Sequence, residues 1–125
     1  MSVDLRRATA TQLRAGYRSG EFAPVEAVET LLAAIAREDE ALGAWLHLRG
    51  DEVRREATNA EATYAVARTS GAAALDALPP LLGVPVALKD LVNMIGTPTT
   101  AGSKILEGYK YSTTRPCIHH EFVRM

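Results

Sequence analysis

The stretch GVPVALKDLVNMIGTPTTAGSKIL, from Gly83 to Leu106, decides how this chain folds. Its first part, Val84 to Leu88, is short, apolar and partly β-branched, which is typical of a buried β-strand. Lys89 and Asp90 follow directly, and glycines, threonines and a serine come after them. An apolar strand that runs straight into two opposite charges raises the question of whether a functional site lies at the strand end.

Two interpretations of Lys89 follow from its position. In the first, the end of a buried strand is poorly hydrated, which disfavours the ammonium form of a lysine. A lysine that is neutral at working pH can act as a general base. In the second, Lys89 extends to solvent and pairs with Asp90. Position alone favours the second.

Three helices are expected before this stretch. The first begins at Thr9, because Thr9 and Gln12 have the spacing of a capping box, and Gly20 ends it. The second begins at Pro24, which suits a first helical turn. Its apolar side chains recur at three- and four-residue spacing and form one stripe: Val25, Val28, Leu31, Leu32 and Ile35.

The third expected helix has Asp51 near its start and Gly71 just past its end. Its core face is made of Val53, Ala57, Ala60, Tyr64 and Ala67. Helices followed by a buried strand predict an α/β layered protein. Only Ala44 to Leu48 offers a second strand, so the predicted sheet is incomplete within this chain.

Composition narrows the class of protein. The chain has 125 residues, enough for one small domain, and a net charge of -1, which gives no general attraction to nucleic acid or acidic membranes. Its single cysteine, Cys117, excludes an internal disulfide. The apolar run from Leu31 to Ala36 is far too short to span a bilayer, and the first ten residues lack the apolar core of a signal peptide. We therefore expect a cytoplasmic protein with no membrane partner and no direct contact with nucleic acid.

The stretch resembles the amidase signature family, whose members carry a G-[IV]-P-x-x-x-K-D block followed by a T-T-x-G-S segment. The matching residues are Gly83, Val84, Pro85, Lys89, Asp90, Gly96, Thr99, Thr100, Gly102 and Ser103. The resemblance covers Leu5 to Tyr111. It implies that residues 1–111 are the N-terminal part of an amidase signature domain, with helices and the first strands of a mixed sheet flanked by helices.

Within the family, GSKILEGY at residues 102–109 is similar to the A subunits of aspartyl/glutamyl-tRNA amidotransferases, although Leu91 and Val92 replace the Asn-Ile common in those subunits. Such subunits hydrolyse glutamine and pass ammonia to a partner that amidates mischarged tRNA. The resemblance implies glutamine or another small carboxamide as substrate and B and C subunits as partners. It implies no cofactor in this chain, with ATP and magnesium bound only by the partner subunit.

The resemblance also assigns roles to individual residues. Lys89 matches the lysine of a Ser-cisSer-Lys catalytic set, in which the lysine takes a proton from a bridging serine that activates the nucleophile. Asp90 is expected to orient the backbone and the turn. Thr99, Thr100, Gly102 and Ser103 are expected to line the substrate site, and no metal is expected. The two serines belong to a Gly-Ser-rich segment that these 125 residues lack, so the chain by itself is expected to be inactive.

Residues 112–125 do not match the family, and we expect a frameshifted or truncated reading frame there. His119, His120 and Glu121 could suggest a metal site, but adjacent histidines rarely chelate one ion and no further ligand cluster is present. Cys117 has no base placed beside it that would make it a nucleophile.

Three interpretations of function remain open at this point. The chain is either a fragment of an amidotransferase A subunit, or a fragment of a general carboxamide amidase, or a non-catalytic helical module that binds a partner.

Overall fold

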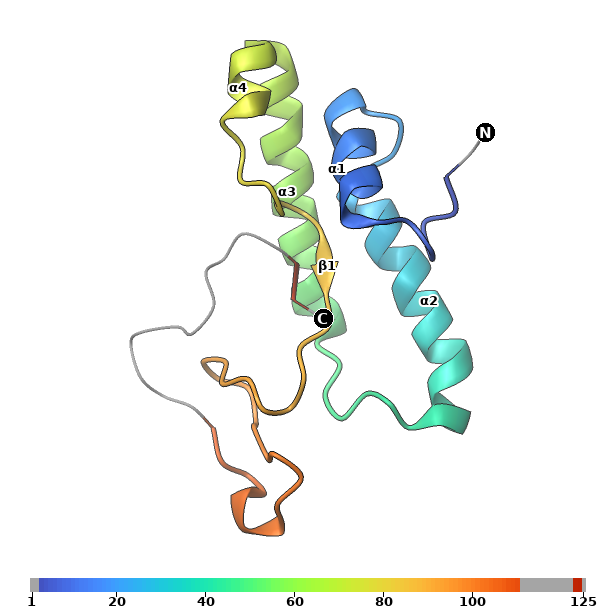
Figure 1. Cartoon of the computed structure of the whole chain (residues 1–125), viewed down its shortest axis with the longest axis vertical. Helices are drawn as coiled ribbons and strands as arrows, with labels where there is room; N and C mark the ends of the chain where they lie inside the picture. The colour runs from blue at the N-terminus through green and yellow to red at the C-terminus, as the bar shows by residue number, and fades with distance from the viewer. Residues whose placement is uncertain (1–2, 111–122, 125) are drawn as a thin grey trace.

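The computed structural model describes residues 3–110 and 123–124 (Figure 1). Helices occupy most of the first 76 residues, and a pair of very short strands follows. The elements are the helices α1 (Ala10–Ser19), α2 (Pro24–Leu42), α3 (Gly50–Ser70) and α4 (Ala72–Asp76), the strands β1 (Pro85–Val86) and β2 (Val123–Arg124), and the 3-10 helix η1 (Lys104–Leu106). None of the helices described is long and apolar enough to cross a membrane.

The start and end of α1 confirm the sequence-based expectation. Gln12 N donates to Thr9 Oγ1 at 3.2 Å, and Thr9 N donates to Gln12 Oε1 at 2.8 Å, which completes the capping box. Gly20 ends the helix with φ of 76°, a left-handed conformation that glycine adopts without steric cost.

Helices α2 and α3 pack as a hairpin through the predicted faces. Val28 and Leu32 of α2 form a buried cluster with Val53 and Ala57 of α3. The buried residues of α3 are the five expected from spacing: Val53, Ala57, Ala60, Tyr64 and Ala67. Val53 and Ala57 thus form the α3 side of the cluster, on the face that the spacing predicted.

A second buried cluster joins α1 to the hairpin and to the start of the strand. It contains Leu13, Tyr17, Phe22, Ala27, Tyr64 and Val84. The rings of Tyr17 and Phe22 meet edge to face, with centroids 5.7 Å apart and planes at 81°. Gly16 leaves room for this ring, because a Cβ at Gly16 would lie 2.1 Å from Phe22 Cζ.

The chain passes from the helices to β1 through Gly83. This residue has φ of 76°, and a Cβ there would lie 3.0 Å from Pro24 Cγ and 3.2 Å from Ala60 Cβ. Just before it, the Tyr64 hydroxyl donates to the Leu82 carbonyl at 3.2 Å. β1 is therefore anchored to α2 and α3, and residues beyond it extend away from the helices (Figure 1).

The strands differ from the expectation. β1 covers Pro85–Val86, shorter than the predicted Val84 to Leu88, and pairs in parallel with β2, with Pro85 opposite Val123 and Val86 opposite Arg124. Only these two strands occur in the described part of the chain, so the larger mixed sheet stays a prediction. Of the expected tail at 112–125, residues 112–122 and 125 lie outside the described residues, and so do Cys117, His119, His120 and Glu121.

The prediction of a strand at Ala44 to Leu48 is wrong. The amides of Ala44 and Trp45 both donate to Asp39 Oδ1, at 2.7 and 3.3 Å, and Gly43 ends α2 with φ of 59°. These bonds fold the segment back over the end of α2, where its alternating apolar side chains have no neighbouring strand to meet. Helix α4, which the sequence patterns did not predict, is tied to α1 because Arg18 bonds the Leu75 carbonyl and the Asp76 carboxylate, each at 2.5 Å.

Candidate active site at the end of strand β1

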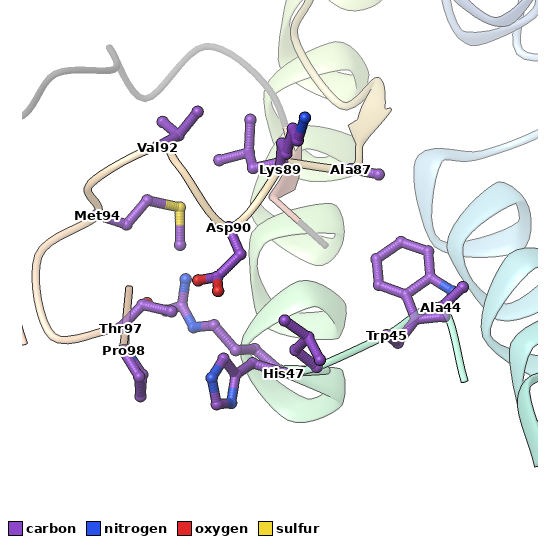
Figure 2. Close-up of a pocket in the computed structure, with 13 residues that line it drawn as sticks. Ala44, Trp45, His47, Ala87, Lys89, Asp90, Val92, Met94, Thr97 and Pro98 are labelled. Atoms are coloured by element: carbon purple, nitrogen blue, oxygen red, sulfur yellow. The ribbon is translucent and has the colours of Figure 1, made fainter. Parts of the chain in front are cut away.

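Lys89 and Asp90 follow β1 at the start of a turn, in which the Val92 amide donates to the Lys89 carbonyl at 2.9 Å. Their side chains leave the backbone in different directions (Figure 2). The Lys89 side chain is exposed, which corrects the expectation of a poorly hydrated lysine. β1 ends at Val86, and Ala87, two residues before the lysine, is exposed as well.

Asp90 joins this segment to the threonines ten residues later. The Thr100 amide donates to Asp90 Oδ1 at 2.9 Å, and the Thr100 hydroxyl donates to Asp90 Oδ2. In addition, the Ala101 amide donates to the Asp90 carbonyl oxygen at 3.0 Å. We call Asp90, Thr100 and Ala101 the Asp90 clasp. The clasp agrees with the role expected for Asp90 from the sequence, which is to orient the backbone and the turn, because the carboxylate fixes a turn.

The clasp also sets the charge of Asp90. The hydroxyl of Thr100, and next its amide, hold the pKa of the Asp90 carboxyl below its usual range, because both donate to the ionised form. The nearby His47 contributes in the same direction. Asp90 is therefore an ionised acceptor at neutral pH and not a proton donor.

A pocket of about 510 Å³ opens beside Lys89 and Asp90 (Figure 2). Two segments line it, the connector between α2 and α3 and the chain after β1. The lining residues are Ala44, Trp45, Leu46, His47, Arg49, Ala87, Leu88, Lys89, Asp90, Val92, Met94, Thr97 and Pro98. A largely apolar hollow with a few charged groups at its edge is typical of a small-molecule site.

The other predicted site residues lie beside this pocket, and none of them lines it. Thr99 is buried, with 6% of its surface exposed, and its amide donates to the Tyr109 carbonyl at 3.1 Å. The Gly102 amide donates to Thr100 Oγ1 at 3.3 Å, and the Ser103 amide donates to the Thr100 carbonyl at 2.8 Å. Residues 99–103 thus form a tight turn behind Asp90, and their contact with substrate stays a prediction.

Sequence reasoning missed the connector side of the pocket. His47 and Arg49 line it opposite Lys89 and Asp90, and the Arg49 guanidinium pairs with Glu52 at the start of α3. The signal in the sequence was Asp39, whose spacing to Ala44 allows the carboxylate to cap the end of α2. The assignment of Ala44 to Leu48 to a strand overlooked this cap.

The arrangement supplies an exposed amine and a fixed turn. Lys89 provides the amine, and Asp90 holds the turn. The one hydroxyl among the pocket-lining residues is that of Thr97, whose Oγ1 is buried. No nucleophile activated by a base therefore faces the pocket within the described residues. The same part of the chain holds no group of three or more His, Cys, Asp or Glu that could bind a metal.

The class of protein is indicated by a Lys-Asp pair that follows β1 and is closed onto a Thr-Thr turn. The model of the Amidase family matches residues 26–115, and the chain belongs to that family. The match includes β1, Lys89 and the Asp90 clasp.

Curated relatives show which members of the Amidase family this chain resembles. The chain is 42% identical over 106 residues to the A subunit of the glutamyl-tRNA(Gln) amidotransferase from Paenarthrobacter aurescens, covering 85% of this chain and 20% of that protein. The corresponding A subunit from Thermobifida fusca is 39% identical over 108 residues, covering 86% and 20%. The chain thus spans about a fifth of the length of these relatives, and the expected similarity to amidotransferase A subunits is confirmed.

Solved structures share the fold of the described residues. One, an inhibitor-bound vestigial protein complex that reveals the evolutionary origins of an s-triazine catabolic enzyme, matches with a TM-score of 0.68 and 30% identity. The match covers 84% of this chain and 21% of the solved chain. A second structure of such a complex has the same TM-score and 27% identity over 94% of this chain.

Proposed function

We propose that this chain forms part of the A subunit of a glutamine-hydrolysing amidotransferase, to which it contributes Lys89 as the proton acceptor. The observation that carries the proposal is the state of Lys89. The lysine borders the pocket at the end of β1, and within the described residues it forms no ion pair. Its amine is therefore available to a proton donor from outside this part of the structure.

The proposed reaction uses two serines from the rest of the enzyme. The neutral Lys89 amine takes a proton from the bridging serine, which takes the proton of the nucleophilic serine as that oxygen adds to the glutamine carboxamide carbon. The C–N bond then breaks, and the proton returns to the departing nitrogen, which leaves as ammonia. Water releases the acyl group as glutamate.

The ammonia would be used by partner proteins. We propose B and C subunits as these partners, with no cofactor held by this chain and with ATP and magnesium bound in the partner subunit. The chain carries only its small net charge of -1, which gives it no strong attraction to tRNA. The larger mixed sheet of the amidase signature fold would be completed by the remaining four-fifths of the enzyme, the share of the relatives that this chain does not cover.

The test uses a hybrid A subunit, in which the matching segment of this chain replaces that of the Paenarthrobacter aurescens protein. Glutamine hydrolysis is measured as ammonia release. Lys89→Ala should abolish turnover with almost no change in melting temperature, since the side chain is exposed. Lys89→Arg should also be inactive, because arginine stays protonated and cannot accept the proton.

Two controls accompany this test. Lys104→Ala removes another exposed lysine, one that does not border the pocket, and should leave activity unchanged. The 125-residue chain alone should release no ammonia, because it lacks the Gly-Ser-rich segment. Full activity of the arginine variant would exclude Lys89 as the proton acceptor.

A general carboxamide amidase is the second candidate function. It is favoured by the solved structures, which concern the origins of an s-triazine catabolic enzyme and match at 30 and 27% identity. Assaying the hybrid and its unsubstituted parent with glutamine and with simple carboxamides separates the two. A shift of preference from glutamine towards simple carboxamides in the hybrid would favour the general amidase.

A non-catalytic helical module is the third candidate. It requires the 125-residue chain to fold by itself. A cooperative thermal melt together with a monomeric elution volume at high concentration would favour this module over the enzyme segment.

A further inference from the structure

Lys89 and Asp90 are adjacent and oppositely charged, yet the structure does not pair them. The two oxygens of the Asp90 carboxylate accept hydrogen bonds from Thr100, one from its amide at 2.9 Å and one from its hydroxyl. The Asp90 carboxylate points away from the Lys89 amine (Figure 2). In the parts of the chain that the structure describes, Lys89 has no carboxylate partner.

We propose that Thr100 is a positioning residue that keeps the Asp90 carboxylate from forming an ion pair with Lys89. Its two uncharged donors occupy the carboxylate and turn it aside, so the lysine is not held as an ammonium ion by its neighbour. The inference rests on the proposed function, in which Lys89 must lose its proton before it can accept one. A carboxylate beside an ammonium favours the charged form of both groups, which is the opposite of what a general base needs.

The charges around the pocket explain why the direction of the Asp90 carboxylate matters. The ionisable residues that line the pocket are His47 and Arg49 from the connector and Lys89 and Asp90 from the chain after β1. Asp90 is thus the one acid among them, and Arg49 is already paired with Glu52. The direction of a single carboxylate therefore decides whether Lys89 has an anionic partner.

The geometry of the clasp suits this task. The Ala101 amide holds the backbone carbonyl of Asp90 at 3.0 Å, so the aspartate is fixed at its backbone as well as at its side chain. Ala101 has φ of 50°, in the left-handed region that alanine rarely adopts. Local strain of this kind persists only where surrounding bonds impose it.

The experiment measures kcat/KM for glutamine against pH in the hybrid A subunit. Thr100→Val removes the hydroxyl donor and frees Asp90 to approach Lys89. We expect the acidic limb of the profile to move to higher pH by about half a unit, the size of a partly exposed ion pair. Thr100→Ser keeps the donor and should restore the original profile.

A second variant tests whether the clasp already keeps the charge of Asp90 away from Lys89. Asp90→Asn removes the negative charge but keeps an oxygen that accepts from the Thr100 amide, so the turn can still close. Because Asp90 does not pair with Lys89 in the parent, the acidic limb of this variant should stay in place. Thr58→Val is the matched control, since the Thr58 hydroxyl bonds the Arg54 carbonyl within α3 at 2.9 Å and lies far from the pocket lining in sequence. This control should leave the profile unchanged.

The outcomes separate the inference from the function on which it depends. A shift to higher pH in Thr100→Val, an unmoved limb in Asp90→Asn and restoration in Thr100→Ser support the positioning role. Equal losses at every pH in Thr100→Val, with its limb unmoved, would make Thr100 merely structural and overturn the inference. Ammonia release by the unsubstituted hybrid that does not depend on Lys89 would instead overturn the proposed function. If Thr100→Val fails to fold, a shift of the Asp90→Asn limb to lower pH overturns the inference by itself, because it would mean that Asp90 already acts on Lys89 in the parent.

Discussion

Two regions of the molecule are held together by different means. The helical region, residues 10–76, contains most of the buried apolar side chains, whereas in the site region, residues 87–110, Met94 is the one described apolar residue that is buried. Large apolar side chains of the site region face solvent instead: Leu91, Ile95, Ile105, Leu106 and Tyr109. The site region therefore keeps its shape through hydrogen bonds such as the Asp90 clasp.

This difference has a consequence for local stability. Apolar burial is the dominant favourable contribution to folding, while exposed hydrogen bonds contribute little net free energy. Regions with few buried apolar contacts open more easily than the core. Substitutions in the helical region should accordingly change global stability, and substitutions in the clasp should change only local order.

The largest expected effect is that of Tyr17→Ala in the helical region. Tyr17 is completely buried and contacts the rings of Phe22 and Tyr64. Losing a buried aromatic ring should cost about 3–5 kcal/mol, enough to unfold a marginal domain. Urea denaturation of the hybrid A subunit, followed by far-ultraviolet circular dichroism, measures the change. Val66→Ala, at a position 66% exposed, should change stability by less than about 0.5 kcal/mol.

Gly16→Ala should have a smaller but clear effect. A Cβ there would lie 2.1 Å from the end of the Phe22 ring, so the ring must move. Overpacking of this kind costs about 1–3 kcal/mol, which outweighs the better helix propensity of alanine. Pairing the change with Phe22→Leu should recover part of the loss. Equal stability of the alanine variant and the parent would mean that the ring does not occupy this site.

The two buried tyrosines should respond to phenylalanine in opposite directions. The Tyr17 hydroxyl is buried with no hydrogen-bond partner among the described residues, and burial raises the pKa of Tyr17, so the group stays neutral. Tyr17→Phe should stabilise the chain by about 1 kcal/mol. Tyr64→Phe loses the bond to the Leu82 carbonyl and should destabilise it by a similar amount. Thermal melts of the hybrid A subunit compare the two variants, and a stability change of the same sign in both would contradict the assignment.

The smallest expected effect is the pH dependence of the clasp. The pKa of Asp90 is lowered in the folded chain, so the clasp contributes stability above the unfolded pKa of 3.8 and loses it as pH falls through the folded value. Hydrogen exchange of the Thr100 and Ala101 amides should therefore be slowed at neutral pH and lose that protection in acid. Asp90→Asn should remove this pH dependence, while the helical amides keep their protection from exchange.

The sequence predicted the helical region well because its signals are local. The capping box at Thr9, the glycines that end α1 and α3, and the spacing on α3 each depend on residues within one or two turns. The strand at Ala44 to Leu48 was wrong because alternation alone does not supply a neighbouring strand. A capping carboxylate, Asp39, bonded the segment's amides instead.

The site was predicted only in part. Motif spacing located Lys89 and Asp90, and the orienting part of Asp90 is confirmed by its bonds to Thr100. The exposure of Lys89 could not be read from the apolar run before it, because burial of a side chain depends on what packs over it in space. The contribution of His47 and Arg49 also depended on tertiary placement, since the connector meets the chain after β1 only in the folded molecule.

Gly83 bears on how amidases can be recombined. Its contacts with Pro24 and Ala60 leave no space for a side chain. The passage from helix to strand therefore depends on close packing between segments that are distant in sequence. A crossover between two homologous genes placed after Val86 would exchange the turn that holds Lys89 and Asp90 as one block and leave these contacts intact. A crossover between Ala60 and Gly83 would take Gly83 from one parent and the residues that it contacts, Pro24 and Ala60, from the other. Shuffled libraries should therefore yield folded hybrids mainly from the first kind of crossover.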